Sequence, residues 1–296
     1  MKLKIALISL LVVSSLSSQN IGTGLTFLKL GVGARSVAMG EASTAIVNGS
    51  PSIFYNPAVS RFDDRNEISL MHKQWIAETS VDYLGTVLPA DAITYSLSAL
   101  TSSIGGIEAR TQPGPAEETF SAKNFAFTFG MSFFVADNFA VGASGKFLYE
   151  KIFVDEANGY GVDLGGLYKI DEHLSSGVSL LNLGSMSILK NEASKLPTTV
   201  RAGLAYASSL TDQIRYTGAV DFLKTIDDSI NHIHVGAEAT YDSTIAVRMG
   251  YQTGYESKSI SAGFGVTYGI VTFDYAFVPF TGALNTTHTF SLSFLL

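Results

Sequence analysis

Large apolar side chains alternate with small or polar ones through most of the chain after residue 66. Within residues 124–133 one face of the segment carries only large apolar side chains, namely Phe125, Phe127, Phe129, Met131 and Phe133. The same alternation recurs at residues 232–241, 244–251 and 271–277. Because successive side chains of a strand point to opposite faces, this pattern predicts β-strands with one apolar face.

We count about fourteen such segments, each of about ten residues, the length that a tilted strand needs to cross a bilayer. The predicted strands begin near Glu67, Val81, Ile93, Phe125, Phe139, Tyr160, Leu174, Thr199, Ile214, His232, Thr244, Ser259, Ile270 and His288. An even number of strands is expected when both ends of the chain lie on the periplasmic side of the membrane. Apart from the short first connection at residues 77–80, short and mostly longer connections alternate, as expected for periplasmic turns and extracellular loops. The long connections are predicted at residues 104–123, 153–159, 185–197, 225–231 and 280–287.

The faces opposite the large apolar residues decide between a membrane barrel and a soluble β-sandwich. They carry mostly Gly, Ala, Ser and Thr with isolated charges, unlike the Lys and Glu mixture of a solvated face. Charged residues make up 15% of the chain, below the roughly 25% of soluble proteins. Since every backbone polar group must be paired inside lipid, we predict an all-β fold, a transmembrane antiparallel β-barrel of about fourteen strands. The alternative is a soluble sandwich whose large residues face a shared core.

Charge and cysteine content exclude other classes of protein. The formal net charge is -7, and an acidic chain does not provide the basic surface that nucleic acids need. The chain has no Cys, which excludes a disulfide scaffold and attachment of lipid to a cysteine. After residue 13 no apolar run approaches the roughly 18 residues of a membrane-spanning helix.

The chain divides into three predicted regions. Residues 1–18 have a basic start, a short apolar run and small residues, as in a secretory signal peptide. Residues 19–65 are rich in Gly, Ala and Ser and too apolar to lie free in water, so we expect them to fold into the barrel mouth as a plug or hatch. Residues 66–296 form the barrel. A barrel of about fourteen strands is wider than the roughly eight-stranded size that side chains fill alone.

Charges of both signs fall on the small-residue faces, which point into the barrel. We predict a charge network in the lumen that bridges the strands, because a Lys or Arg that faced the lipid midplane would cost about 2–4 kcal/mol. A substrate path lined by the same side chains is the alternative. The residues are Lys146, Glu150, Asp163, Arg201, Arg215, Asp221, Glu238, Arg248 and Asp274.

The segment FLKLGVGARSVAMGEASTAIVNGSPSIFYNPA, residues 27–58, resembles the amino-terminal signature of PorV/PorQ family outer-membrane proteins. That signature runs Phe-Leu-Lys/Arg-Ile/Leu-Gly-x-Gly-Ala-Arg, then Met-Gly-x-Ala, then Asn-Pro-Ala. The family is in turn similar to FadL-type fatty-acid transporters, which are fourteen-stranded barrels with an Asn-Pro-Ala hatch. The matching positions assigned to the plug are Gly31, Gly33, Ala34, Arg35, Met39, Gly40, Asn56, Pro57 and Ala58.

The resemblance implies a non-enzymatic part in type IX protein secretion or cargo attachment, in the outer membrane of a Gram-negative bacterium. The implied partners are outer-membrane lipid and either secretion-system proteins or the carboxy-terminal signal domains of cargo. A FadL-like channel that binds a hydrophobic small molecule is the alternative function, and an enzyme housed in a barrel is a third.

The sequence offers little support for metal, cofactor or catalytic chemistry. His232 and His234 share a strand face, but no third metal ligand is evident. The Gly31-Val32-Gly33 stretch lacks the third Gly and the preceding strand of a dinucleotide loop. No Gly-x-Ser-x-Gly elbow occurs. We therefore predict no cofactor, no metal and no catalytic residues.

Overall fold

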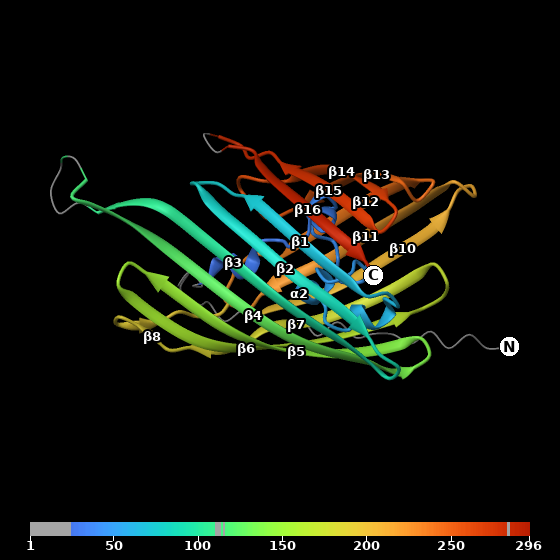
Figure 1. Ribbon diagram of the computed structural model, residues 1–296, viewed down its shortest axis with the longest axis horizontal. Coiled ribbons are helices and arrows are strands. Elements are labelled where there is room, and N and C mark those ends of the chain that lie inside the picture. The colour runs from blue at the N-terminus through green and yellow to red at the C-terminus, as the bar shows by residue number, and fades with distance from the viewer. Residues whose placement is uncertain (1–24, 110–113, 115, 283–284) are drawn as a thin grey trace.

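The computed structural model shows a closed antiparallel barrel of fourteen strands (Figure 1). It describes residues 25–109, 114, 116–282 and 285–296, so the predicted signal peptide at residues 1–18 lies outside the described residues. Around the barrel the order is β1-β16-β15-β14-β13-β12-β11-β10-β7-β6-β5-β4-β3-β2, and β8 with β9 forms a separate hairpin. The strands are β1 (Glu67–Gln74), β2 (Thr79–Pro89), β3 (Ile93–Ala109), β4 (Glu118–Ala136), β5 (Phe139–Ile152), β6 (Asp155–Lys169), β7 (Leu174–Met186), β8 (Ile188–Leu189), β9 (Glu192–Ala193), β10 (Thr199–Ser209), β11 (Ile214–Thr225), β12 (His232–Tyr241), β13 (Ile245–Gln252), β14 (Ile260–Tyr268), β15 (Val271–Val278) and β16 (Thr287–Leu295).

The predicted alternation is confirmed along the wall. In β1, β12 and β13 buried and exposed residues alternate almost without a break. The exposed positions carry large apolar side chains, such as Phe127, Ile233 and Met249. First and last strands pair from Glu67 with Leu295 to Gln74 with His288, which closes the barrel. The barrel therefore turns an apolar surface outward and encloses small and polar side chains.

The height of the wall is uneven. β3 has 17 residues and β4 has 19, whereas β1, β13 and β15 have 8 each. The prediction of a loop over residues 104–123 is wrong, because the β3–β4 ribbon continues through most of it and projects beyond its neighbours (Figure 1). A shift in strand register between Ile104 and Ile107, with Gly106 at φ 67°, lets the pairing continue. The predicted loops 153–159 and 185–197 likewise contain strand, namely the start of β6 and the β8–β9 hairpin.

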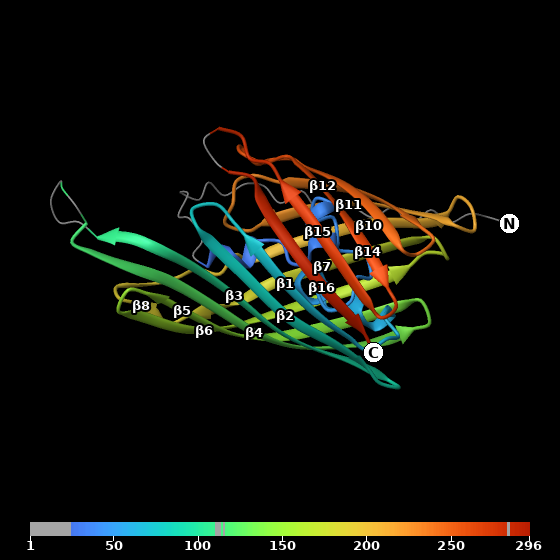
Figure 2. The same ribbon diagram turned by 45° about the horizontal axis from the view of Figure 1, so that its top comes forward.

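Residues 25–66 lie mostly inside the barrel, with exposed residues 64–66 at the periplasmic rim (Figure 2). This stretch, the N-terminal segment, contains four short helices: η1 (Thr26–Lys29), α1 (Ala34–Ala38), α2 (Ser52–Tyr55) and η2 (Val59–Phe62). Most of its side chains are buried, including Val32, Met39 and Tyr55. Among the described helices, none is long and apolar enough to cross a membrane. The segment passes through the lumen before the chain enters β1.

Glycines on the inner wall make room for the N-terminal segment. Eight strands each present one glycine whose added Cβ atom would come within 2.0 to 2.9 Å of an atom in the segment. Real Cβ atoms do not approach other atoms so closely, so these glycines let the segment pack directly against the wall. We call this set the glycine belt: Gly130, Gly142, Gly165, Gly177, Gly203, Gly236, Gly250 and Gly263.

Candidate functional site

The lumen contains a cavity on each side of the N-terminal segment. Short turns close one side of the barrel, which is the periplasmic side in outer-membrane barrels. The cavity there, the periplasmic cavity, has a volume of about 680 Å³ and is lined by turn residues such as His173 and Ser243. The opposite cavity, the outer cavity, has a volume of about 490 Å³ and is lined by loop residues such as Trp75 and Tyr255. Arg35 and Asn48 line the first cavity and Leu30 and Glu41 the second, so the segment separates the two.

An ionic cluster fixes α1 to the wall above the periplasmic cavity. Two guanidinium nitrogens of Arg35 donate to Glu238 of β12, with Nη2 2.7 Å from Oε1 and Nε 2.9 Å from Oε2. Arg248 of β13 donates to Oε2 of Glu238 at 2.5 Å and to Oδ1 of Asp274 at 2.7 Å. Burial disfavours the charged form of Arg35, but the acidic side chains around it, Glu238 first and then Asp274 and Glu67, together outweigh burial and raise the pKa of the guanidinium above its ordinary value. The four side chains form one chain of alternating charge.

A second cluster holds the middle of the segment. Oδ2 of Asp221 in β11 accepts hydrogen bonds from the backbone N–H groups of Ser43 and Thr44, both at 2.9 Å, and from the Thr44 hydroxyl at 2.6 Å. Arg201 of β10 donates to the same oxygen at 2.9 Å and to the carbonyl of Glu41 at 2.6 Å. Asp221 is fully buried. With this many donors on one oxygen, Asp221 holds the segment firmly and orders it against the wall.

The remaining predicted lumen charges interact with the wall and its loops. Lys146 and Asp163 form an ion pair at 2.8 Å, and Oδ1 of Asp163 accepts from the backbone N–H of Asn182 at 2.8 Å. Glu150 accepts a hydrogen bond from Ser194 at 2.6 Å. Arg215 lies exposed at the rim of the periplasmic cavity and donates to Ser243. The nine predicted residues thus form three separate ion-paired groups, with Glu150 and Arg215 apart.

Asn56 fixes the Asn-Pro-Ala motif by its side chain. Its Nδ2 group donates to the carbonyls of Thr44 and Gly166, at 2.9 and 3.1 Å, and its Oδ1 accepts from the backbone N–H of Ala58 at 3.1 Å. Pro57 lies against Gly142 of the belt. The motif therefore ties two parts of the segment to each other and to β6.

The other motif residues also contact the wall or the segment. The backbone N–H of Ala34 donates to Ser291, and that of Gly40 donates to Ser261 at 3.0 Å. Met39 packs against Gly236, and Gly33 has φ 81°, which favours glycine. Lys73 donates to the carbonyl of Gly31. That the segment closes the barrel to solutes stays a prediction.

Glu41 is a buried acid of the outer cavity that sequence reasoning missed. Its Oε1 lies 3.4 Å from Nζ of Lys258. Burial opposes ionisation, but the positive charges around it, with Lys258 the strongest, outweigh burial and lower its pKa to about 2. The residue has φ 60°, an uncommon value for a residue other than glycine. Its only sequence signal was an acidic residue within a Gly- and Ala-rich stretch.

Aromatic rings surround Lys258 at the mouth of the outer cavity. Nζ of Lys258 lies 4.5 Å from the ring centre of Tyr255 and 5.8 Å from that of Trp75. His232 stacks on Tyr255 with ring centres 4.2 Å apart, and His234 contacts the Tyr255 hydroxyl at 3.1 Å. In the described part of the chain, no group of three or more His, Cys, Asp or Glu side chains is placed to hold a metal ion.

Comparison with solved structures shows the fold. The toluene transporter TbuX of Ralstonia pickettii superimposes with a TM-score of 0.63 at 14% sequence identity, over 90% of this chain and 98% of that one. The CymD monoaromatic hydrocarbon channel gives 0.65 at 13% identity, over 93% and 98%. A FadL homologue of Pseudomonas aeruginosa gives 0.58 at 12%, over 88% and 97%. The predicted FadL-like barrel fold is confirmed.

Comparison with protein families shows the membership of the chain, although no curated protein matches it. The family described as type IX secretion system membrane protein PorP/SprF matches residues 50–294. This confirms the predicted association with type IX secretion, while the finer PorV/PorQ resemblance stays a prediction. The fold and the family together identify an outer-membrane protein. The chain belongs to the PorP/SprF family of type IX secretion system membrane proteins.

Proposed function

We propose that this barrel is a non-enzymatic component of type IX protein export, which docks secretion-system proteins or the carboxy-terminal signal domain of cargo, as the PorV/PorQ resemblance implies. The observation that carries the proposal is the family match over residues 50–294. The lumen supports docking over threading. The N-terminal segment crosses the lumen and is held there by Glu238, Asp221 and the glycine belt, so a polypeptide would have to displace it in order to pass.

The outer rim offers surface for such docking. The β3–β4 ribbon projects beyond its neighbours (Figure 1), and Val154 and Ile226 at the ends of other strands are 71% and 59% exposed. Exposed apolar residues at a water-facing rim favour contact with a protein partner. Val154 and Ile226 are therefore suitable positions for a photo-activated cross-linker.

The test combines affinity capture with cross-linking in cells. We expect the tagged barrel to recover secretion-system or cargo proteins from outer membranes, with adducts to the same proteins at positions 154 and 226. A cross-linker at Leu210, which is 72% exposed on a periplasmic turn, is the matched control and tests which face the partner uses. Recovery of fatty acids alone, with no surface protein, would favour the alternative function.

The outer cavity favours one alternative, a channel for hydrophobic small molecules. Its lining includes Leu28, Leu30, Phe54 and Phe280, next to Lys258 and Glu41. Apolar cavities with a few polar groups are typical small-molecule sites. The structural neighbours TbuX and CymD are described as a toluene transporter and a monoaromatic hydrocarbon channel, which adds support to this function.

The alternative can be tested by fluorescence, because Trp75 is the only Trp of the chain and lines the outer cavity. Saturable quenching by toluene or a fatty acid in detergent solution would support the channel. Non-saturable quenching that equals that of free tryptophan would count against it.

A further inference from the structure

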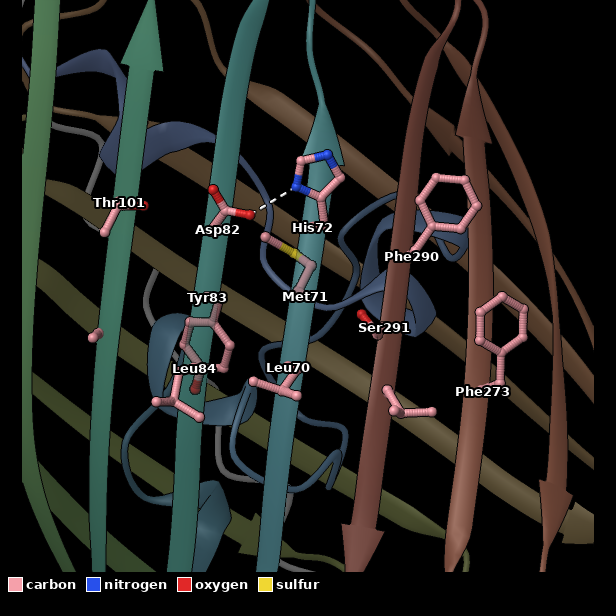
Figure 3. Close-up of a pocket in the computed structure, with 12 residues that line it drawn as sticks. Leu70, Met71, His72, Asp82, Tyr83, Leu84, Thr101, Phe273, Phe290 and Ser291 are labelled. Carbon is pink, nitrogen blue, oxygen red and sulfur yellow. Dashed lines mark hydrogen bonds and ion pairs between the residues drawn. The ribbon is translucent and has the colours of Figure 1, made fainter.

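The outer surface of the barrel carries a hollow where β1 pairs with β16 (Figure 3). Its volume is about 520 Å³, and its lining comes from β1, β2, β3, β15 and β16. The lower part is apolar, with Leu70 and Leu84 drawn side by side on neighbouring strands (Figure 3). Ala99 on β3 offers only a methyl group, whereas its register partner on β4 is Phe127. The small side chain deepens the wall at this place.

A hydrogen-bonded histidine and aspartate lie at one end of the hollow. Nδ1 of His72 is 2.7 Å from Oδ1 of Asp82, and the two residues are register partners on β1 and β2 (Figure 3). Their side chains are 56% and 55% exposed, on the same outer face as Leu70 and Leu84. A polar pair of this kind directed at hydrocarbon is costly. A polar group from the surroundings should therefore form hydrogen bonds with His72 and Asp82.

The polarity of the wall shows where this pair lies in the membrane. Toward the outer loops, the neighbouring outward positions on β1, β2 and β3 are polar, namely Gln74, Ser80 and Ser103. Toward the periplasm they are Leu70, Leu84 and Ala99, which are register neighbours of one another. The row of His72 and Asp82 therefore marks the extracellular border of the hydrocarbon, and the hollow extends from that border into the outer leaflet.

We propose that the hollow binds one outer-leaflet lipid whose head group carries hydroxyl or amide groups. The polar end of the hollow faces the head-group level and the apolar end faces the middle of the bilayer, which is the orientation of an outer-leaflet lipid. Among the contacts of the described residues, none uses Oδ2 of Asp82 or Nε2 of His72. A hydroxyl or amide of the head group donates to Asp82, and an acyl chain lies along Leu70, Leu84 and Ala99.

The test uses native mass spectrometry of the full barrel in detergent, titrated with lipid A or with a phosphatidylcholine. Lipid A carries hydroxyl and amide donors, and the phosphatidylcholine head has none. We expect selective binding of lipid A. Asp82→Leu and Ala99→Phe should each weaken it about tenfold, the effect of losing one hydrogen bond to a charged group or of filling the hollow. Thr86→Val, an outward change on β2 outside the hollow, is the matched control.

The variants are suited to the test because each adds apolar surface to a lipid-facing position, so the barrel is expected to fold. Heat-modifiable mobility on gels checks this for each one. Equal binding of both lipids, or full binding in Asp82→Leu and Ala99→Phe, would overturn the proposal. A cross-linker at Leu84 that captures a protein instead of lipid in cells would overturn it as well. None of these outcomes depends on the role in secretion.

Discussion

The fork of Arg35 in α1 meets both carboxylate oxygens of Glu238 in β12, at 2.7 and 2.9 Å, although 203 residues separate the two in the chain. Arg248 pairs with one of these oxygens and also with Asp274. Helix α1 is thus connected by charge to strands β12, β13 and β15. Because Glu238 alone pairs with two arginines, it is the residue on which the cluster depends.

Replacing Glu238 by Ala should destabilise the folded barrel. The change leaves Arg35 without its ion-pair partner and Arg248 with Asp274 alone, and removing one partner of a buried pair costs about 3 kcal/mol. Urea unfolding in detergent, followed by heat-modifiable gel mobility, measures the loss. Glu172→Ala, a change of the same type on an exposed turn, should have no comparable effect. Equal midpoints for the two variants would contradict the structural role of the cluster.

Two glycines of β5 distinguish the effect of close packing from the general effect of replacing a strand glycine by alanine. A Cβ atom at Gly142 would lie 2.5 Å from the backbone carbon of Pro57 and 2.6 Å from the backbone nitrogen of Ala58. Gly142→Ala should therefore cost about 1–3 kcal/mol, as overpacking does. A Cβ atom at Gly145, on the same strand, would meet no atom of the described residues within 4 Å, so Gly145→Ala should change stability by about 0.5 kcal/mol or less.

Proteolysis adds a readout for the segment itself. In Gly142→Ala we expect cleavage within residues 25–66 at protease concentrations that leave Gly145→Ala intact. The reason is that the segment can no longer pack closely against β5. Identical cleavage of both variants would show that the segment does not depend on this contact.

Asn56→Ala should release the segment from β6. The buried carbonyls of Thr44 and Gly166 lose the Nδ2 donor, and unsatisfied buried groups cost about 2 kcal/mol in total. Asn56→Asp keeps an acceptor for the Ala58 N–H but removes both donors, so it should be destabilised as well. Asn191→Ala on the exposed loop between β8 and β9 is the control. An Asn56→Asp variant with unaltered unfolding would show that the donor bonds contribute nothing.

The wall of the barrel could be predicted from the sequence because period-two alternation depends only on neighbouring residues. Positions such as Phe127 and Met249 reveal their outward direction without any knowledge of the partner strand. Strand ends were harder to predict. The β3–β4 ribbon continues past Gly105 and Gly106, which favour a turn in sequence but here accompany a shift in register.

The partners of the lumen charges could not be predicted in the same way. Glu238 and Arg248 are register partners across β12 and β13, and that pairing depends on the turn between the strands. The contacts of Asp221 with Ser43 and of Arg35 with Glu238 depend on the path of the N-terminal segment through the lumen. That path is set by where the wall carries glycine, which appears in the sequence only as a small residue on the inner face.

Glu41 gives a prediction for the dependence of stability on pH. Its pKa is lowered from 4.5 to about 2 in the folded barrel, so the unfolded chain binds the proton more tightly. The ionised carboxylate therefore stabilises the fold above the unfolded pKa, and this contribution, about 3 kcal/mol, is lost as pH falls from about 5 to 2. Glu41→Gln should be less stable than the wild type at pH 7, and the difference should vanish near pH 2. Urea midpoints of both proteins across this range measure the effect. A difference that stays constant with pH would show that Lys258 and the other positive charges around Glu41 do not hold it in its ionised form.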